Sequence, residues 1–254
     1  YSWDAIVMKN ATITKDSTIS NVDGKPVVVY GALTVDTNAV VTIAKGTTMY
    51  FHSGAGIDVK GSLKVEGGKN VENEKNEVTL RCDRLDRMVS NLTYDNNPGQ
   101  WGGVHFYDIS HDNSFDYVDL HGATDAIVCD SAKNQDQTML TLKHTTIHNT
   151  KGVGVEATSC KIVMENTQIS NTFGNCVKLL GGDVTMNHCT IAQYYPFDSA
   201  RGYAISFFNK SGDNKYPLTL RVYNSLIKGY ADDVMLWSEN KDGEDKQSKI
   251  GRAV

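Results

Sequence analysis

Three segments of the chain share one frame: KHTTIHNTKGVGV (residues 143–155), ENTQISNTFGNCV (residues 165–177) and NHCTIAQ (residues 187–193). Each carries an isoleucine in the same slot, 22 residues after the one before, at Ile147, Ile169 and Ile191. The frame returns in YNSLIKGYADDVML (residues 223–236), with an insertion of 14 residues before it, and more weakly in FDYVDLHGATDAIV (residues 115–128). In that weaker copy Leu120 takes the isoleucine slot. A fixed period of this kind indicates a repeat architecture.

Within each copy, apolar and polar residues alternate over short runs rich in Thr, Val and Ile, which predicts β-strands. No segment of useful length combines helical spacing with capping signals. Repeats of roughly 20 to 25 residues with short strands and tight corners are typical of a solenoid, whereas the leucine-rich repeat string is absent. The sequence therefore predicts an all-β fold, a single-stranded parallel β-helix.

The first half of the chain repeats a shorter motif. VYGALTV (residues 29–35) and VKGSLKV (residues 59–65) place Gly31 and Gly61 30 residues apart. We expect the two heptads to be equivalent corners of neighbouring or near-neighbouring coils, because glycine permits sharp bends and close backbone approach. Asparagines tolerate left-handed backbone angles, so bends are also expected at Asn149, Asn166, Asn171 and Asn175.

Composition excludes several classes of protein. Hydrophobic residues make up 40% of the 254 residues, which is inconsistent with disorder. The net charge of −5 offers no basic field for nucleic acid or anionic lipid. The apolar runs are too short to span a bilayer. The chain starts at Tyr1 without a leader, so we expect either a cytosolic protein or one whose leader has been removed.

The five cysteines are odd in number and contain no C-x-x-C pair: Cys82, Cys129, Cys160, Cys176 and Cys189. This pattern favours buried free thiols over a disulfide framework, with one bridge between adjacent coils left as an alternative.

Most of residues 40–235 resembles the right-handed parallel β-helix proteins of the pectin-lyase-like kind. The resemblance is carried by segments such as TIAKGTTMYFHSGAGIDVKGSLKV, PGQWGGVHFYDISHDNSFDYVDLHGATDAIVCDS and GGDVTMNHCTIAQYYPFDSARGYAISF. More narrowly, the chain is similar to predicted secreted or lipid-anchored β-helix proteins, the surface lipoproteins of anaerobic gut bacteria. The resemblance implies a right-handed coil and a location at the bacterial cell envelope, at the outer-membrane surface or outside the cell.

Catalytic candidates must be sought down columns of stacked coils. The 22-residue frame places Glu156 beside Lys178 in an outward column with Ser206 and Leu236, which is more typical of a cross-coil ion pair than of a calcium-dependent lyase. Asp232 and Asp233 resemble the Gly-Asp-Asp element of polygalacturonases. The companion elements of that family are missing, so turn chemistry is the favoured interpretation and both residues remain weak catalytic candidates.

The seven histidines do not predict a metal site. His144 and His188 share a column but lie two coils apart, roughly 10 Å, which is too far for one zinc ion. His105 and His111 lack a third ligand at a persuasive spacing. No phosphate-binding or dinucleotide-binding motif is present, so we expect no metal and no cofactor.

Aromatic residues near glycine-rich or inserted segments give the best indication of a ligand site. Aromatic faces beside Asp, Asn and Arg suit sugar rings. The candidate ligand-binding residues are Trp101, Tyr107, Tyr194, Tyr195, Arg201 and Trp237. The competing interpretation is that these side chains cover the ends and seams of the core.

We predict one β-helix domain over residues 1–237, with external loops near residues 85–100 and 194–216. Residues 238–254 form a polar tail or the start of further coils, and the lack of an evident cap suggests a longer chain or a contact with another chain. The expected function is that of a non-catalytic envelope protein that binds a glycan or a surface protein. The alternatives are a polysaccharide lyase or glycoside hydrolase acting on uronic-acid-containing glycans, and a structural spacer or adhesin segment.

Overall fold

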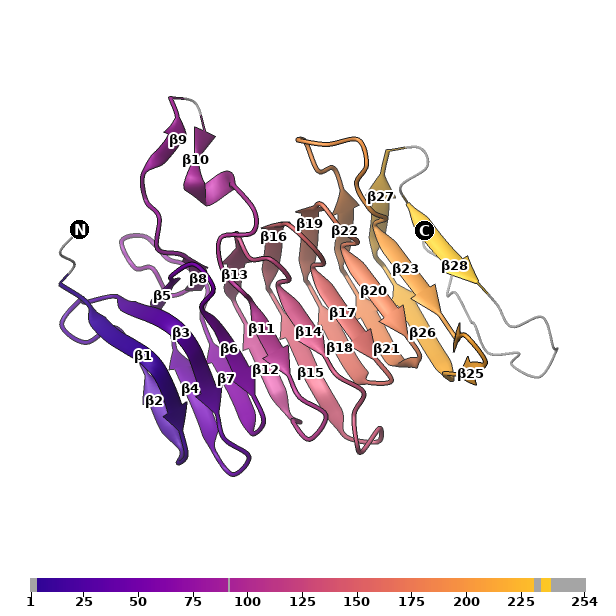
Figure 1. The fold of residues 1–254 in the computed structure, drawn as a ribbon, viewed down its shortest axis with the longest axis horizontal. Coiled ribbons are helices and arrows are strands. Elements are labelled where there is room, and N and C mark those ends of the chain that lie inside the picture. The colour runs from indigo at the N-terminus through magenta and orange to yellow at the C-terminus, as the bar shows by residue number, and fades with distance from the viewer. Residues whose placement is uncertain (1–3, 91, 231–233, 239–254) are drawn as a thin grey trace.

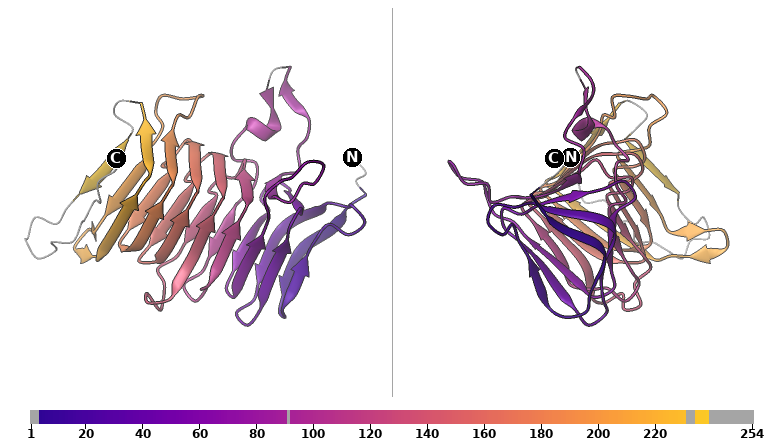
Figure 2. Two further views of the ribbon diagram at one scale, coloured as in Figure 1. Left: turned by 180° about the vertical axis from the view of Figure 1, so that it is seen from behind. Right: turned by 60° about the vertical axis from the view of Figure 1, so that its left-hand side comes forward.

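The computed structural model describes residues 4–90, 92–230 and 234–238. Its strands stack coil upon coil along the long axis (Figure 1), and the turned views show successive coils around one interior (Figure 2). Each regular coil gives one strand to each of three parallel sheets, here called sheets I, II and III. The predicted parallel β-helix is confirmed.

Sheet I contains β5 (Thr48–Phe51), β8 (Val78–Cys82), β13 (Val118–His121), β16 (Thr146–Thr150), β19 (Gln168–Thr172), β22 (Thr190–Gln193) and β27 (Leu226–Gly229). Sheet II contains β6 (Gly56–Val59), β11 (Val104–Phe106), β14 (Ile127–Cys129), β17 (Val155–Thr158), β20 (Val177–Leu180), β23 (Ile205–Phe208) and β28 (Met235–Ser238). Sheet III contains β2 (Ser17–Ile19), β4 (Val40–Ala44), β7 (Ser62–Glu66), β12 (Asn113–Asp116), β15 (Thr138–Lys143), β18 (Lys161–Glu165), β21 (Gly182–Asn187) and β26 (Leu218–Tyr223).

Sheets I and II are joined at the N-terminal end by long strands. The first part of β3 (Val27–Val35) pairs with β5 and its last part pairs with β6, and β1 (Ile6–Ile13) lies along β3. The chain bends at Gly31, between these two parts, with φ of +76°. Both sheets can therefore share one strand, because glycine adopts this left-handed conformation without strain.

The isoleucine slot is a single buried column in sheet I. Ile147, Ile169 and Ile191 pair in direct register, and Leu120 and Ile227 extend the column at either end as expected. The three central isoleucines have no exposed surface. Each buried aliphatic side chain of this size contributes about 1.5–3 kcal/mol through removal from water, so the stacked columns hold the coils together.

The corners between sheets III and I repeat one backbone feature. At each corner one residue has a left-handed backbone, with φ between 46° and 54°. These residues are Tyr117, His144, Asn166, His188 and Asn224. Asn149 and Asn171 also adopt left-handed angles, as predicted, whereas the side chain of Asn175 accepts a hydrogen bond from the Tyr203 amide.

The expectation that Gly31 and Gly61 occupy equivalent corners is wrong. Leu33, which follows Gly31, pairs with Ile57 in sheet II. Leu63, which follows Gly61, pairs with Val41 in sheet III. The two heptads thus mark different corners, since the sequence interval of 30 residues does not correspond to a whole coil in this irregular region.

Two excursions leave the coils. Between β8 and β11 the chain forms β9 (Arg87–Val89), β10 (Leu92–Thr93) and a 3-10 turn η1 (Tyr94–Asn96), which project from the body (Figure 1). The segment 194–216, expected as one external loop, contains the coil strand β23, followed by the small pair β24 (Lys210–Ser211) and β25 (Asn214–Lys215). The tail from 239 to 254 lies outside the described residues.

The five cysteines are free and buried, as the sequence predicted. Burial raises the pKa of the Cys176 thiol to about 11, although a hydrogen bond from Thr172 works in the opposite direction. Among the described residues, no helix has the length and apolar character to cross a membrane.

Truncation of the central isoleucine, Ile169→Ala, should lower the free energy of unfolding by about 2–5 kcal/mol, because it leaves a cavity between two coils. Chemical denaturation followed by circular dichroism measures this loss. Gln168→Ala, at the exposed neighbouring position, is the matched control and should change stability little. Equal effects of the two substitutions would contradict the stacked column.

Native thiols should not react with N-ethylmaleimide at pH 8, because all five are buried and the Cys176 pKa is raised. Mass spectrometry should find five adducts only after denaturation. Rapid native labelling of several cysteines would contradict their placement in the core.

Candidate functional site

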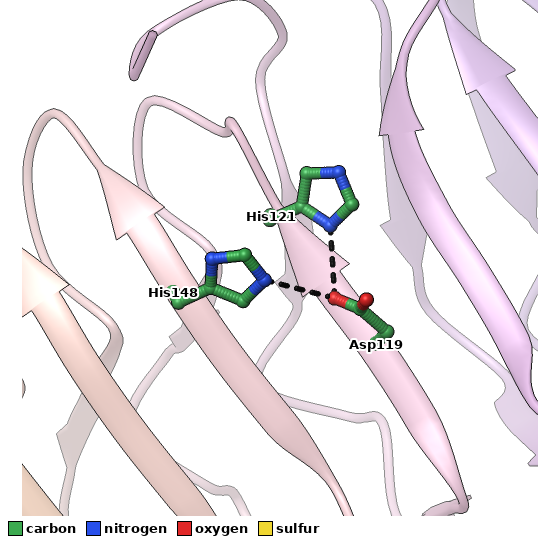
Figure 3. A group of neighbouring side chains, drawn as sticks. All are labelled: Asp119, His121 and His148. Atoms are coloured by element: carbon green, nitrogen blue, oxygen red, sulfur yellow. Dashed lines mark hydrogen bonds and ion pairs between the residues drawn. The ribbon is translucent and has the colours of Figure 1, made fainter. Parts of the chain in front are cut away.

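A charged cluster lies on the outward side of sheet I, on the adjacent strands β13 and β16 (Figure 3). Alternation along β13 turns Val118 and Leu120 into the core, so Asp119 and His121 point the other way. His148 on β16 pairs in register with His121, and their rings stack with centroids 4.8 Å apart. The register of two coils therefore brings both histidines to one carboxylate.

The cluster is joined by short contacts. His121 donates from Nδ1 to Asp119 Oδ1 at 2.8 Å and from Nε2 to Asp95 Oδ1 at 2.7 Å. His148 Nε2 lies 3.1 Å from the same Asp119 oxygen. Arg81 on β8 forms an ion pair with Asp95 at 2.7 Å. When His121 is doubly protonated, the positive charges of His121 and Arg81 balance the negative charges of Asp119 and Asp95.

The external loop between β8 and β11 covers the cluster. It contributes Asp95 from η1, and only 6% of the His121 side chain is exposed. The loop is held by the Arg84 guanidinium, which stacks 3.8 Å from the centroid of the Tyr94 ring. At the base of the loop the indole N–H of Trp101 donates to the His121 carbonyl at 2.9 Å. The loop therefore has a defined position over sheet I.

The electrostatics follow from this enclosure. Burial of the ring disfavours its charged form, but the hydrogen bonds to Asp119 and Asp95 outweigh burial and raise the pKa of His121 to about 9. Burial would raise the pKa of Asp119, yet the hydrogen bonds from His121 and His148 hold it well below its usual range. The pKa of Asp95 is also lowered, because contacts with His121 and Arg81 exceed the effect of burial.

Sequence reasoning missed this cluster, although the repeat contained the signal. His121 and His148 each follow the isoleucine slot by one residue, the slot being Leu120 in the first case. The interval between them is 27 residues rather than 22, because the intervening coil is longer. Asp95 carries no such signal, since a projecting loop has no register with the coils.

A second polar surface lies on the outward side of sheet II. Asp58 on β6 stands opposite His105 on β11, and His105 pairs with Asp130 at 2.9 Å. The Tyr107 ring stacks against His105 with centroids 4.4 Å apart, and Lys60 lies 5.4 Å from the centre of the same ring. Aromatic, acidic and basic groups are thus gathered on neighbouring coils.

A hollow of about 300 Å³ adjoins these residues and is lined by Asp58, His105 and Asp125, with glycine backbone between them. A side chain at Gly103 would collide with the Asp125 carbonyl, and one at Gly102 would crowd the Ala55 carbonyl. Backbone therefore forms part of the lining of the first hollow, with Gly102 exposed and Gly103 buried.

Further along the same face, a second hollow of about 250 Å³ lies between Glu156, Lys178 and Phe208. Lys178 and Glu156 form the expected cross-coil ion pair, with 2.8 Å between Nζ and Oε1. The outward column predicted from the repeat is confirmed, since Glu156, Lys178, Ser206 and Leu236 pair in succession.

The six predicted ligand-binding residues do not form one site. Trp101 is 1% exposed and stacks on Phe51 with ring centroids 4.2 Å apart, so its side chain lies in the core and presents no surface to a ligand. Tyr107 stacks on His105, which lines the first hollow. Trp237 on β28 is 53% exposed and lies parallel to Phe207, with 6.3 Å between ring centroids.

The structure does bring Tyr194 and Arg201 together. The Tyr194 ring meets Tyr230 edge-on with centroids 5.2 Å apart, and the Arg201 guanidinium lies 3.9 Å from the centre of the Tyr230 ring. Tyr195 is buried and its ring packs edge-on against Phe173. The catalytic candidates Asp232 and Asp233 lie outside the described residues.

The sequence of residues 4–193 matches the family described as the right-handed beta helix region. The chain belongs to this family. The match confirms the right-handed coil that the resemblance implied. It extends from the start of the described chain to the end of β22. No curated protein shows significant sequence similarity to this right-handed β-helix.

Solved structures align with the chain at low identity. The periplasmic alginate epimerase AlgG aligns with 12% identity and a TM-score of 0.34, over 94% of this chain and 66% of the epimerase. The chain thus spans about two thirds of that protein's length. The polygalacturonase from Erwinia carotovora ssp. carotovora aligns with 12% identity and a TM-score of 0.34, over 94% of this chain and 98% of that chain.

Loss of the loop carboxylate, Asp95→Ala, should destabilise the protein by about 1–3 kcal/mol, because His121 and Arg81 lose their acceptor. Solvent screens part of this effect, since 36% of the Asp95 side chain is exposed. Denaturation in buffer containing EDTA measures the loss. Asp86→Ala, which removes a solvent-facing partner of Arg84 in the same loop, should leave stability nearly unchanged.

Proposed function

We propose that this protein is a non-catalytic β-helix protein of the bacterial cell envelope that binds an extended glycan along the outward face of sheet II. The observation that carries the proposal is the presence of two hollows along sheet II, one beside β6 and β11 and the other beside β17, β20 and β23. The strands beneath them follow one another at about 4.8 Å, so a saccharide chain running along the axis meets a new coil at regular intervals.

The chemistry of the first hollow suits a sugar. The C–H face of a pyranose packs against an aromatic ring, while its hydroxyls exchange hydrogen bonds with carboxylates and peptide groups. Asp58 and Asp125 in the lining supply acceptors, Gly102 supplies exposed backbone, and the Tyr107 ring stacks on His105, which lines the same hollow. In the second hollow Phe208 supplies the apolar surface beside Glu156 and Lys178.

The charges favour an uncharged glycan. Asp58 and Asp125 line the first hollow, and Asp130 pairs with His105 beside it, against the cations Lys60 and, when protonated, His105. An anionic polysaccharide would meet repulsion there, whereas hydroxyl groups would not. The ligand class proposed for this face is therefore a neutral oligosaccharide.

The alternative is a lyase or hydrolase of the same fold acting on uronic-acid-containing glycans. It is favoured by Asp58 and Asp125 lining one hollow together with His105. Two contacts weigh against it. Asp125 Oδ1 already accepts the Val153 amide at 2.8 Å, and Asp130 is paired with His105. A hydrolase needs two carboxylates available to the glycosidic bond, so binding without turnover is the better proposal.

The proposed location is the cell surface. It is supported by the resemblance of the sequence to surface lipoproteins of gut bacteria, in which a leader or lipid anchor holds the β-helix at the membrane. A surface protein is the second partner class in this setting, because the ring cluster of Tyr194, Arg201 and Tyr230 stands on a separate loop surface.

Binding to immobilised neutral oligosaccharides should weaken about tenfold in Tyr107→Ala, because one stacking contact is worth roughly 1.4 kcal/mol. A glycan array identifies the ligand, and calorimetry with that oligosaccharide measures the change. Tyr223→Ala is the matched control, since Tyr223 is an exposed tyrosine on sheet III and should not affect binding.

The same samples decide between binder and enzyme. Incubation of the full chain with the bound glycan should release no new reducing ends and no unsaturated products. Turnover that is abolished in Asp58→Asn would replace the proposal with the enzymatic alternative. The absence of any glycan that binds more weakly to Tyr107→Ala than to the parent chain would overturn the proposal.

A further inference from the structure

We propose that Asp119, His121 and His148 bind one divalent transition-metal ion such as Zn²⁺. Each of these residues offers one ligand atom, and the three ligand atoms all lie within 4.8 Å of one another. The two imidazoles come from adjacent coils and approach the same carboxylate oxygen of Asp119 (Figure 3). This site is separate from the glycan-binding face, and no residue is shared between them.

Two of the three ligand separations are close to those of a metal centre. Nitrogen and oxygen ligands lie about 2.0–2.2 Å from zinc, so ligand atoms in a tetrahedral site are roughly 3.3 Å apart. The observed separations from Asp119 Oδ1 are 2.8 Å to His121 Nδ1 and 3.1 Å to His148 Nε2. The ligand atoms lie within 4.8 Å of one another, so the two imidazole nitrogens must also adjust their separation to share the ion. The side chains of Asp119 and His148 are 30% and 27% exposed, so they have room for that adjustment.

The surrounding residues orient the ligands. Asp95 accepts the Nε2 proton of His121 at 2.7 Å, which fixes that ring with Nδ1 directed at Asp119. Arg81 in turn holds Asp95 at 2.7 Å. A carboxylate on the far nitrogen of a metal-binding histidine is the common second layer of such sites, because it sets the tautomer and increases ligand basicity.

The ligand set selects the class of metal. Two imidazoles and one carboxylate suit zinc, cobalt, nickel or iron(II), whereas calcium and magnesium require a shell of oxygen atoms. Three protein ligands leave at least one position for water or for an incoming group, as in catalytic rather than structural zinc sites. The exposed sides of Asp119 and His148 place that position toward solvent.

The competing state of the cluster is the ion-pair network described above. There a proton, rather than a metal, lies between His121 Nδ1 and Asp119 Oδ1. The metal would displace this proton, so the two states exclude each other at one position. Direct metal binding therefore distinguishes them.

The experiment uses the full chain, stripped with chelator and titrated with Co²⁺ as a spectroscopic probe and then with Zn²⁺ in competition. We expect one Co²⁺ per chain, with visible absorption of the intensity typical of four-coordinate cobalt, which Zn²⁺ abolishes and Ca²⁺ does not. The signal should be lost in His148→Ala. In Asp95→Asn, which keeps all three ligands, affinity should fall about 10- to 100-fold.

The matched control is His144→Ala. His144 also pairs with an aspartate, Asp116, at 2.8 Å, but no second histidine approaches that carboxylate in the described structure. This variant should bind Co²⁺ like the parent chain. Circular dichroism checks that each variant is folded, and Asp119→Asn replaces His148→Ala if the latter is not. Absence of Co²⁺ binding by the parent chain, or equal binding by His148→Ala or its substitute, would overturn the proposal.

Discussion

Direct register between successive coils is the constraint on which the structure depends. The slot residues Leu120, Ile147, Ile169, Ile191 and Ile227 stack although the intervals between them are 27, 22, 22 and 36 residues. A shift of one residue would turn every inward side chain of that strand to the surface. In sheet I, extra residues therefore lie between strands, and each excursion begins and ends at a corner without disturbing the column, whereas β15 in sheet III carries a register shift between Thr138 and Leu140.

The same register builds surfaces as well as the core. Outward positions stack into columns just as inward positions do, but they carry no packing requirement and are free to hold polar groups. Their chemistry then depends on what covers them. Sheet II is open, so Glu156 and Lys178 form a solvent-screened pair beside a hollow. Sheet I is covered near β13 by the external loop, so His121 is enclosed and its charge must be balanced.

The regular half of the chain was predictable because its repeat is a physical consequence of stacking. The isoleucine column, the Glu156–Lys178 column and the asparagine corners follow from counting residues in one frame. Two kinds of feature do not follow. In the first half, strands are shared between sheets, so the glycine heptads resemble each other without being stacked. The loop that supplies Asp95 has no register at all, and its position depends on contacts made only after folding.

Trp101, which the sequence suggested as a ligand-binding aromatic residue, lies in the core. Its ring stacks on Phe51, and its N–H holds the carbonyl of His121 at 2.9 Å. The next two residues, Gly102 and Gly103, form part of the lining of the first hollow on sheet II. One segment thus ends the loop over the histidine cluster and begins the backbone surface of the neighbouring face. A small side chain at position 101 would remove the donor to the His121 carbonyl. It would also remove the buried ring that anchors the segment leading into Gly102 and Gly103.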